Sequence, residues 1–89
     1  MSEGNTNPQT SRKWCITLNN WTTEEYSILK NYLNTKNTWI IGKEIDENGT
    51  PHLQAFVYHN NAIKFSTLKN VCDRMHLEKA RGTVFFVFK

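Results

Sequence analysis

The chain has 89 residues, which is enough for one domain with a single modest hydrophobic core and excludes a second domain with its own function. Its formal net charge of +3 is mildly basic, and its two cysteines lie far apart without a CxxC spacing, which favours a reduced intracellular chain. The sequence contains neither an N-terminal apolar segment nor a run of about 18 apolar residues. It therefore predicts neither secretion nor a membrane partner.

The chain begins with a polar segment whose composition differs from that of the remaining residues. Residues 1–11 are rich in Ser, Asn, Thr, Gly and Pro without apolar periodicity, which is typical of a disordered arm. Trp14–Leu18 then alternates large apolar and smaller side chains, as in a strand that has one buried face. Because Asn19 and Asn20 are common turn residues, we expect this first strand to end there.

A capping-box signature opens the next element. Thr22 can accept a hydrogen bond from the backbone of Glu25, and the Glu25 carboxylate can accept one from the backbone of Thr22. Apolar side chains then recur at helical spacing as far as Leu33. We therefore expect a helix over Thr23–Leu33.

The middle of the chain predicts a β-hairpin. Thr38–Ile45 is rich in β-branched and aromatic residues, and residues 46–49, Asp-Glu-Asn-Gly, have strong turn chemistry. His52–His59 has the same strand character, so it should pair with the first segment in antiparallel fashion. The Asn60-Asn61 pair should end this strand.

The C-terminal third predicts a short helix and a last strand. Ser66 can cap a helix over Thr67–Asp73, and Met75–Lys79 can form a further strand. The complete order is then strand, helix, strand, strand, helix, strand. This order is the split βαβ pattern of ferredoxin-like and RRM-like folds, an α+β class in which two helices cover one antiparallel sheet.

A candidate site lies on the predicted hairpin. His52 and Gln54 are two residues apart on a strand, so they face the same way, while Leu53 faces the core. Glu44 lies near the end of the paired strand and can reach the same face. A carboxylate, an imidazole and an amide oxygen suit Mg²⁺ or Mn²⁺ better than structural zinc. From spacing alone, however, a lone strand histidine is more often a hydrogen-bonded surface or core residue.

Other polar residues have two possible interpretations. From Lys64 onward, six lysines and arginines stand against two acidic residues, which fits a polyanionic partner and fits a solvated basic face about equally well. Asn19 and Asn20 can bind bases or phosphates, or can simply begin a turn. His59 and His76 are isolated in the sequence and are expected to be structural or exposed.

Four short blocks form a series along the chain: CITLNN at 15–20, WIIGKE at 39–44, TPHLQ at 50–54 and HLEKARGT at 76–83. In this order they resemble the rolling-circle replication initiator (Rep) of circoviruses, nanoviruses and related small circular single-stranded DNA viruses. Four blocks in order are far more specific than any one of them. The resemblance extends from about Lys13 to Thr83.

This resemblance implies an endonuclease-like domain of the HUH class over residues 12–83, on the same split βαβ fold, with single-stranded or hairpin origin DNA as its partner. It implies that Glu44, His52 and Gln54 bind a divalent metal, with Gln54 in the place of the second histidine of the class. The first block and the later basic residues become candidate DNA contacts, although Lys64 and Lys69 could merely solvate a helix. The full set is Thr17, Leu18, Asn19, Asn20, Lys64, Lys69, Lys79 and Arg81.

In this family a tyrosine attacks a phosphodiester at the replication origin, which leaves a 5′-phosphotyrosine link and a free 3′-hydroxyl. The Tyr-x-x-Lys block expected after Gly82-Thr83 is missing, and an apolar tail over residues 84–89 stands in its place. We interpret this tail as the product of a frameshift, an alternative splice or a truncated gene. Tyr26, Tyr32 and Tyr58 are expected to be packing residues, so no catalytic residue is assigned.

Three functions therefore remain open. The first is a viral Rep endonuclease domain, and the second is a non-catalytic origin-binding fragment that can compete with full-length Rep. The third is an RNA-binding module, which is disfavoured because the aromatic Gly-Phe signature of that fold is absent. For any of these functions we expect an intracellular location, in the host nucleus if the chain belongs to a eukaryotic virus.

Overall fold

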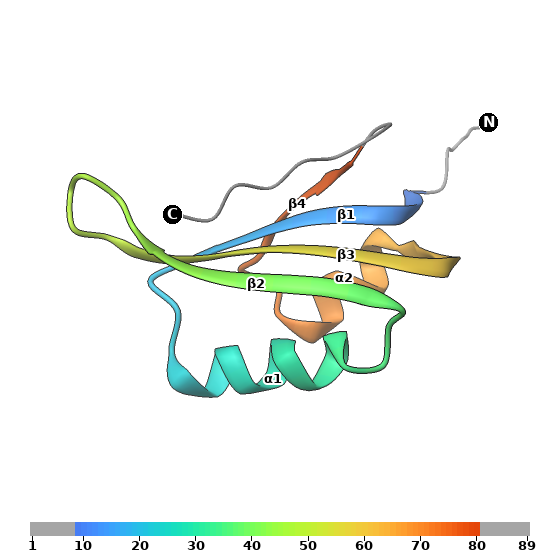
Figure 1. Cartoon of the computed structure of the whole chain (residues 1–89), viewed down its shortest axis with the longest axis horizontal. Coiled ribbons are helices and arrows are strands. Elements are labelled where there is room, and N and C mark those ends of the chain that lie inside the picture. The colour runs from blue at the N-terminus through green and yellow to red at the C-terminus, as the bar shows by residue number, and fades with distance from the viewer. Residues whose placement is uncertain (1–8, 81–89) are drawn as a thin grey trace.

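The computed structural model describes residues 9–80 of the chain. Four strands and two helices succeed one another in the predicted order (Figure 1). Their bounds are β1 Thr10–Asn19, α1 Thr23–Leu33, β2 Thr38–Ile45, β3 Pro51–Lys64, α2 Phe65–Val71 and β4 His76–Lys79. The predicted α+β class and split βαβ order are confirmed. The polar segment 1–8, Arg81 and the tail 84–89 lie outside the described residues.

The strands form one antiparallel sheet in the order β2-β3-β1-β4. Both helices lie on the same side of this sheet (Figure 1). The side chains of β1 and β3 therefore divide between a helix-covered face and the opposite one, which we call the outer face. On the two central strands the outer face carries Lys13, Cys15, Thr17, Asn19, His52, Gln54, Phe56 and Tyr58.

The hydrophobic core lies between the helices and the sheet. Alternate residues of β1 and β3 contribute to it, as the two-residue period of a strand requires. Trp14 is the largest of these side chains, and its buried indole N–H donates to the Ile63 carbonyl at 3.0 Å. The most deeply buried members of the core are Trp14, Ile16, Leu18, Leu29, Leu33, Leu53, Ala55, Val57, Leu68 and Met75.

Two elements have the bounds that local sequence signals predict. The first helix spans Thr23–Leu33 and the second strand spans Thr38–Ile45. The capping box is complete, because Thr22 Oγ1 accepts from the Glu25 N–H at 3.0 Å and Glu25 Oε1 accepts from the Thr22 N–H at 2.9 Å. In the hairpin turn, Asp46 Oδ1 accepts from two backbone N–H groups, and Gly49 has a φ of 85° that suits glycine.

The central strands are longer than predicted. β1 begins at Thr10, so residues 10 and 11 belong to the sheet and not to a disordered arm. β3 continues through Asn60-Asn61, and the prediction that this pair ends the strand is wrong. The pair instead lies in a bulge, where four residues, 59–62, lie opposite the single Arg12. Pairing with the first residues of β1 resumes beyond the bulge, which is why the strand continues.

The last two elements also differ from the prediction, at the start of each and at the end of α2, which lies at Val71 and not at Asp73. The α2 helix begins at Phe65, its N-cap is Lys64 without a side-chain hydrogen bond, and Ser66 is not the cap. β4 begins at His76, one residue later than expected. The Phe65 N–H donates to the Gln9 carbonyl, so the position of this helix start is tied to the beginning of β1. Neither helix among residues 9–80 is long and apolar enough to span a membrane.

The α1 helix offers a direct test of this packing. Leu29 is fully buried and its neighbour Ile28 is 44% exposed. We expect Leu29→Ala to lower the free energy of unfolding by about 2–5 kcal/mol, because it leaves a cavity under the helix. The matched control Ile28→Ala should change it by about 0.5 kcal/mol or less. Urea titration of both variants measures the difference, and equal losses would contradict the assigned helix face.

Candidate metal centre and nucleic-acid interface

Glu44 and His52 meet on the outer face of the sheet. The strand register pairs them directly across the β2–β3 hairpin, so their side chains lie on the same face. The Glu44 Oε1 and His52 Nε2 atoms are 3.1 Å apart. The side chains are 24% and 19% exposed, so both are partly shielded but remain accessible to a ligand.

Gln54 lies on the same face, two residues along β3 from His52. Its pairing partners are Gly42 on β2, which has no side chain, and Thr17 on β1. Within residues 9–80 no group of three His, Cys, Asp or Glu side chains could hold a metal, so a third protein ligand at this position would have to be of another type, such as the Gln54 amide. The three residues predicted from strand spacing are thus on one face, and their role as ligands stays a prediction.

The end of β1 lies beside these three residues, Glu44, His52 and Gln54, which we call the trio. Asn19 pairs with His52, which places another polar side chain of the first block on the outer face. Leu18 alternates to the other face, where it pairs with Leu53 and is fully buried. Its side chain is therefore part of the core and is not available to contact DNA.

Asn20 lies in the turn after β1. It is exposed, and its φ of 52° is a left-handed conformation that asparagine tolerates better than most residues. Its N–H donates to the Pro51 carbonyl at 2.8 Å. The turn is thereby fixed to the start of β3, next to His52.

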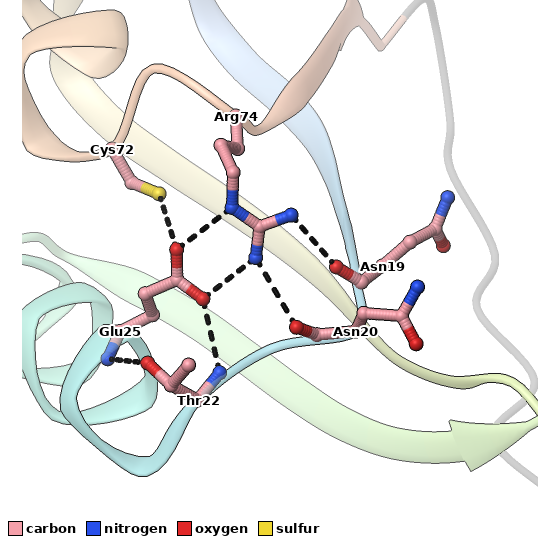
Figure 2. A network of polar contacts seen from close by, with 6 residues as sticks. All are labelled: Asn19, Asn20, Thr22, Glu25, Cys72 and Arg74. Atoms are coloured by element: carbon pink, nitrogen blue, oxygen red, sulfur yellow. Dashed lines mark hydrogen bonds and ion pairs between the residues drawn. The ribbon is translucent and has the colours of Figure 1, made fainter.

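Arg74 joins this turn to the start of α1 (Figure 2). Its Nε and Nη2 atoms donate to the two carboxylate oxygens of Glu25 at 2.9 and 2.7 Å. Its Nη1 and Nη2 atoms also donate to the carbonyls of Asn19 and Asn20 at 3.1 and 3.2 Å. A planar guanidinium can satisfy all four acceptors at once, which an ammonium could not do with the same geometry. Arg74 therefore positions the turn that flanks the trio.

Sequence reasoning did not find the role of Arg74. The capping box predicts the helix start but assigns the Glu25 carboxylate to the local backbone alone. Hydrogen bonds from Arg74, and then from the Thr22 N–H, lower the pKa of Glu25 to about 2. The Cys72 thiol adds a longer contact to the same carboxylate, with Sγ 3.6 Å from Oε2. Glu25 is consequently ionised at neutral pH and remains so in mild acid.

The predicted basic DNA contacts that lie within residues 9–80 do not assemble beside the trio. Lys69 Nζ donates to the carbonyls of Asp73, at 3.0 Å, and Met75, so it is engaged within the α2–β4 loop. Lys79 pairs with Trp14 and therefore lies on the helix side of the edge strand β4. Lys64 lies at the opposite end of β3 from His52. Arg81 lies outside the described residues.

A second histidine–glutamate pair lies on the outer face near the sheet edge. His76 Nε2 lies 3.0 Å from Glu78 Oε2, and the two side chains are 68% and 69% exposed. His76 is therefore exposed, as expected, but its isolation in the sequence does not leave it without a partner. The pair is on β4, and His76 lies opposite Thr17. It provides a more exposed counterpart of the Glu44–His52 pair.

Comparison with known proteins identifies the class. The family model described as "Putative viral replication protein" matches residues 11–85. The chain belongs to this family of viral replication proteins. It is 45% identical to the replication-associated protein of pigeon circovirus over 82% of the chain and 43% identical to that of canary circovirus over 82%. It is also 36% identical to that of porcine circovirus 2 over 90% of the chain.

These relatives confirm the resemblance to circovirus Rep. The chain spans about a quarter of their length, with coverage of 23% for pigeon circovirus, 26% for canary circovirus and 26% for porcine circovirus 2. The matched region contains the whole described sheet from Ser11 onward, including the trio and the Arg74 contacts.

The Arg74–Glu25 contact predicts a pH dependence. The pKa of Glu25 is about 2 in the folded chain and lies near its ordinary value of 4.5 in the unfolded one, so the contact stabilises the fold above pH 4.5. This contribution should disappear as the pH falls from 4.5 towards 2. Glu25→Gln retains a capping side chain but loses the charge.

We therefore expect Glu25→Gln to be less stable than the parent chain at pH 6, with the two curves converging at low pH. Chemical unfolding at several pH values measures this difference. The neighbouring exposed Glu24→Gln serves as the control and should behave like the parent. A constant offset between Glu25→Gln and the parent across the whole range would contradict the assignment.

Proposed function

We propose that this chain binds single-stranded DNA of a viral replication origin on the outer face of its sheet, with Mg²⁺ or Mn²⁺ held by Glu44, His52 and Gln54. The observation that carries the proposal is the convergence of Glu44 and His52 beside Asn19 in a chain of the viral replication family. The partner would be single-stranded or hairpin origin DNA.

The donor atoms fit a small divalent ion. Ligand atoms in adjacent positions around an octahedral ion, with bonds of about 2.1 Å, lie about 3.0 Å apart. The observed separation between Glu44 Oε1 and His52 Nε2 is 3.1 Å. The Gln54 amide would add a neutral oxygen from the neighbouring position on the strand. A bound ion would supply positive charge to a DNA phosphate, which few basic side chains on this face could do.

The surrounding residues suit a nucleic-acid strand. Thr17 and Asn19 carry hydrogen-bonding groups in the same two rows of the sheet as Gln54 and His52. Side chains of these types contact phosphates, sugars and base edges in protein–DNA complexes. Because Arg74 donates hydrogen bonds to the Asn19 and Asn20 carbonyls, the end of β1 would be ordered before DNA binds.

The tyrosines favour binding without cleavage by this chain. The chain contains three tyrosines, and Tyr26 and Tyr32 belong to α1 on the other side of the sheet. Tyr58 is on the outer face, but it lies six positions along the strand from His52, a distance of about 20 Å. None of them is next to the trio, so a nucleophile for nicking would have to come from elsewhere.

The metal proposal predicts a specific loss. Glu44→Gln removes the charged ligand with little change in shape, and we expect the affinity for Mn²⁺ to fall at least about tenfold. Glu78→Gln is the matched control, because it removes a carboxylate that also contacts a histidine on the outer face. Titration calorimetry of the purified chains measures both affinities. Equal affinities for the parent and Glu44→Gln would disprove the site.

The DNA proposal predicts metal-dependent binding without a covalent product. A fluorescent single-stranded origin hairpin should show higher anisotropy with the chain and Mn²⁺, and the increase should be lost with a chelator. Asn19→Ala should weaken this binding and leave the Mn²⁺ affinity unchanged. Denaturing gels of the same samples should show no protein–DNA adduct. An adduct would show that a tyrosine of this chain acts as a nucleophile and that the proposed restriction to binding is wrong.

A further inference from the structure

A polar cavity lies far from the outer-face trio, between the C-terminal end of α1, the distal part of β3 and the start of α2. Its volume is about 390 Å³. It lies about 23 Å along β3 from His52, judged from the rise per residue of a strand. The lining residues are Tyr32, Lys36, His59, Asn61, Ala62, Ile63, Lys64 and Thr67.

Two buried polar atoms in this lining have no protein partner. Tyr32 Oη and His59 Nδ1 are shielded from solvent, and neither makes a hydrogen bond to the described part of the chain. Buried polar side-chain atoms are usually hydrogen-bonded, so each exception requires an explanation. Here both atoms belong to residues that line the same cavity, so a ligand that enters the cavity can supply their partner once these side chains turn toward it.

The strand backbone is also irregular at this position. Residues 59–62 form the bulge opposite Arg12, and the cavity lining includes three of the residues from 59 to 62. β-Bulges redirect side chains and are common next to functional sites. The cavity therefore lies where β3 departs from regular pairing.

The charges of the lining select the type of ligand. Lys36 and Lys64 contribute ammonium groups, and no acidic residue belongs to the lining. Lys36 Nζ lies 4.6 Å from the centre of the Tyr32 ring, which holds one positive charge over the residue whose hydroxyl lacks a partner. Burial raises the pKa of Tyr32, so its phenol remains a neutral hydrogen-bond donor at physiological pH.

We propose that this cavity binds a phosphate group, either free inorganic phosphate or the 5′-phosphate of a nucleotide, with Tyr32 Oη and His59 Nδ1 as hydrogen-bond partners. Lys36 and Lys64 supply the compensating charge. The cavity is larger than a phosphate ion and falls within the size range of about 300–1,000 Å³ that is typical of small-molecule sites. The proposal is independent of DNA binding at the outer face.

Thermal unfolding of the full chain without added metal tests the proposal. A ligand that binds only the folded state raises the melting temperature in a saturable manner. The parent chain should show such a rise with millimolar inorganic phosphate, compared with chloride at equal ionic strength. Parallel titrations with thymidine 5′-monophosphate and thymidine distinguish the sources. A response to the nucleotide alone assigns the site to nucleotides, and thymidine should have no effect.

Tyr32→Phe is the decisive variant, because it removes a single oxygen atom that has no partner in the protein. It should fold as well as the parent, and its affinity for phosphate should fall at least tenfold. Tyr26→Phe on the same helix is the matched control and should retain the parent response. Phosphate also stabilises proteins generally by exclusion from their surface, so only the difference between these variants counts.

A second readout keeps the test independent of stability. The His59 ring resonances should shift on phosphate titration in the parent chain, and Lys36→Gln should weaken that response. An equal rise in melting temperature for the parent and Tyr32→Phe, or unshifted His59 resonances, would show that the cavity holds only water and would overturn the proposal.

Discussion

One-sided burial of the two central strands is the constraint on which the rest of this structure depends. β1 and β3 pair along most of their length, and both helices pack on a single face of the sheet. Because strand side chains alternate, burying Leu18 and Leu53 places Asn19, His52 and Gln54 on the outer face. A register slip of one residue would move those polar groups into the core. The hydrophobic packing that stabilises the fold therefore also creates the candidate site.

A second constraint joins elements that the sheet alone would not hold together. Exposed ion pairs usually contribute little stability. The Arg74 guanidinium, however, contacts both oxygens of Glu25 and two backbone carbonyls at the end of β1. It thereby connects the start of α1, the Asn19–Asn20 turn and the loop before β4 (Figure 2). Its main effect is on geometry, because the turn it holds lies beside His52.

β3 connects two regions of different chemistry. Near its start, His52 and Gln54 face outward beside Glu44 of β2. Together they offer an imidazole, an amide and a carboxylate, which suit a cation. Near its end, a cavity beside the bulge is lined by two lysines and by two residues with polar atoms that lack protein partners, which suits an anion. The same strand therefore supports a proposed metal and DNA site on one face and a proposed phosphate site at the other end. The two proposals can be tested separately, since no residue belongs to both.

The sequence by itself determined the features that depend on near neighbours. The capping box predicts α1, the turn residues predict the hairpin, and strand alternation places His52 and Gln54 on one face, with Glu44 across the hairpin. The tertiary structure alone decided the continuation of β3 through the asparagine pair, the helix start at Phe65 and the partners of Arg74. These features depend on contacts between segments far apart in the chain, such as Arg74 and Glu25, which are 49 residues apart. Local propensity carries no information about such contacts, because they form only when packing brings the segments together.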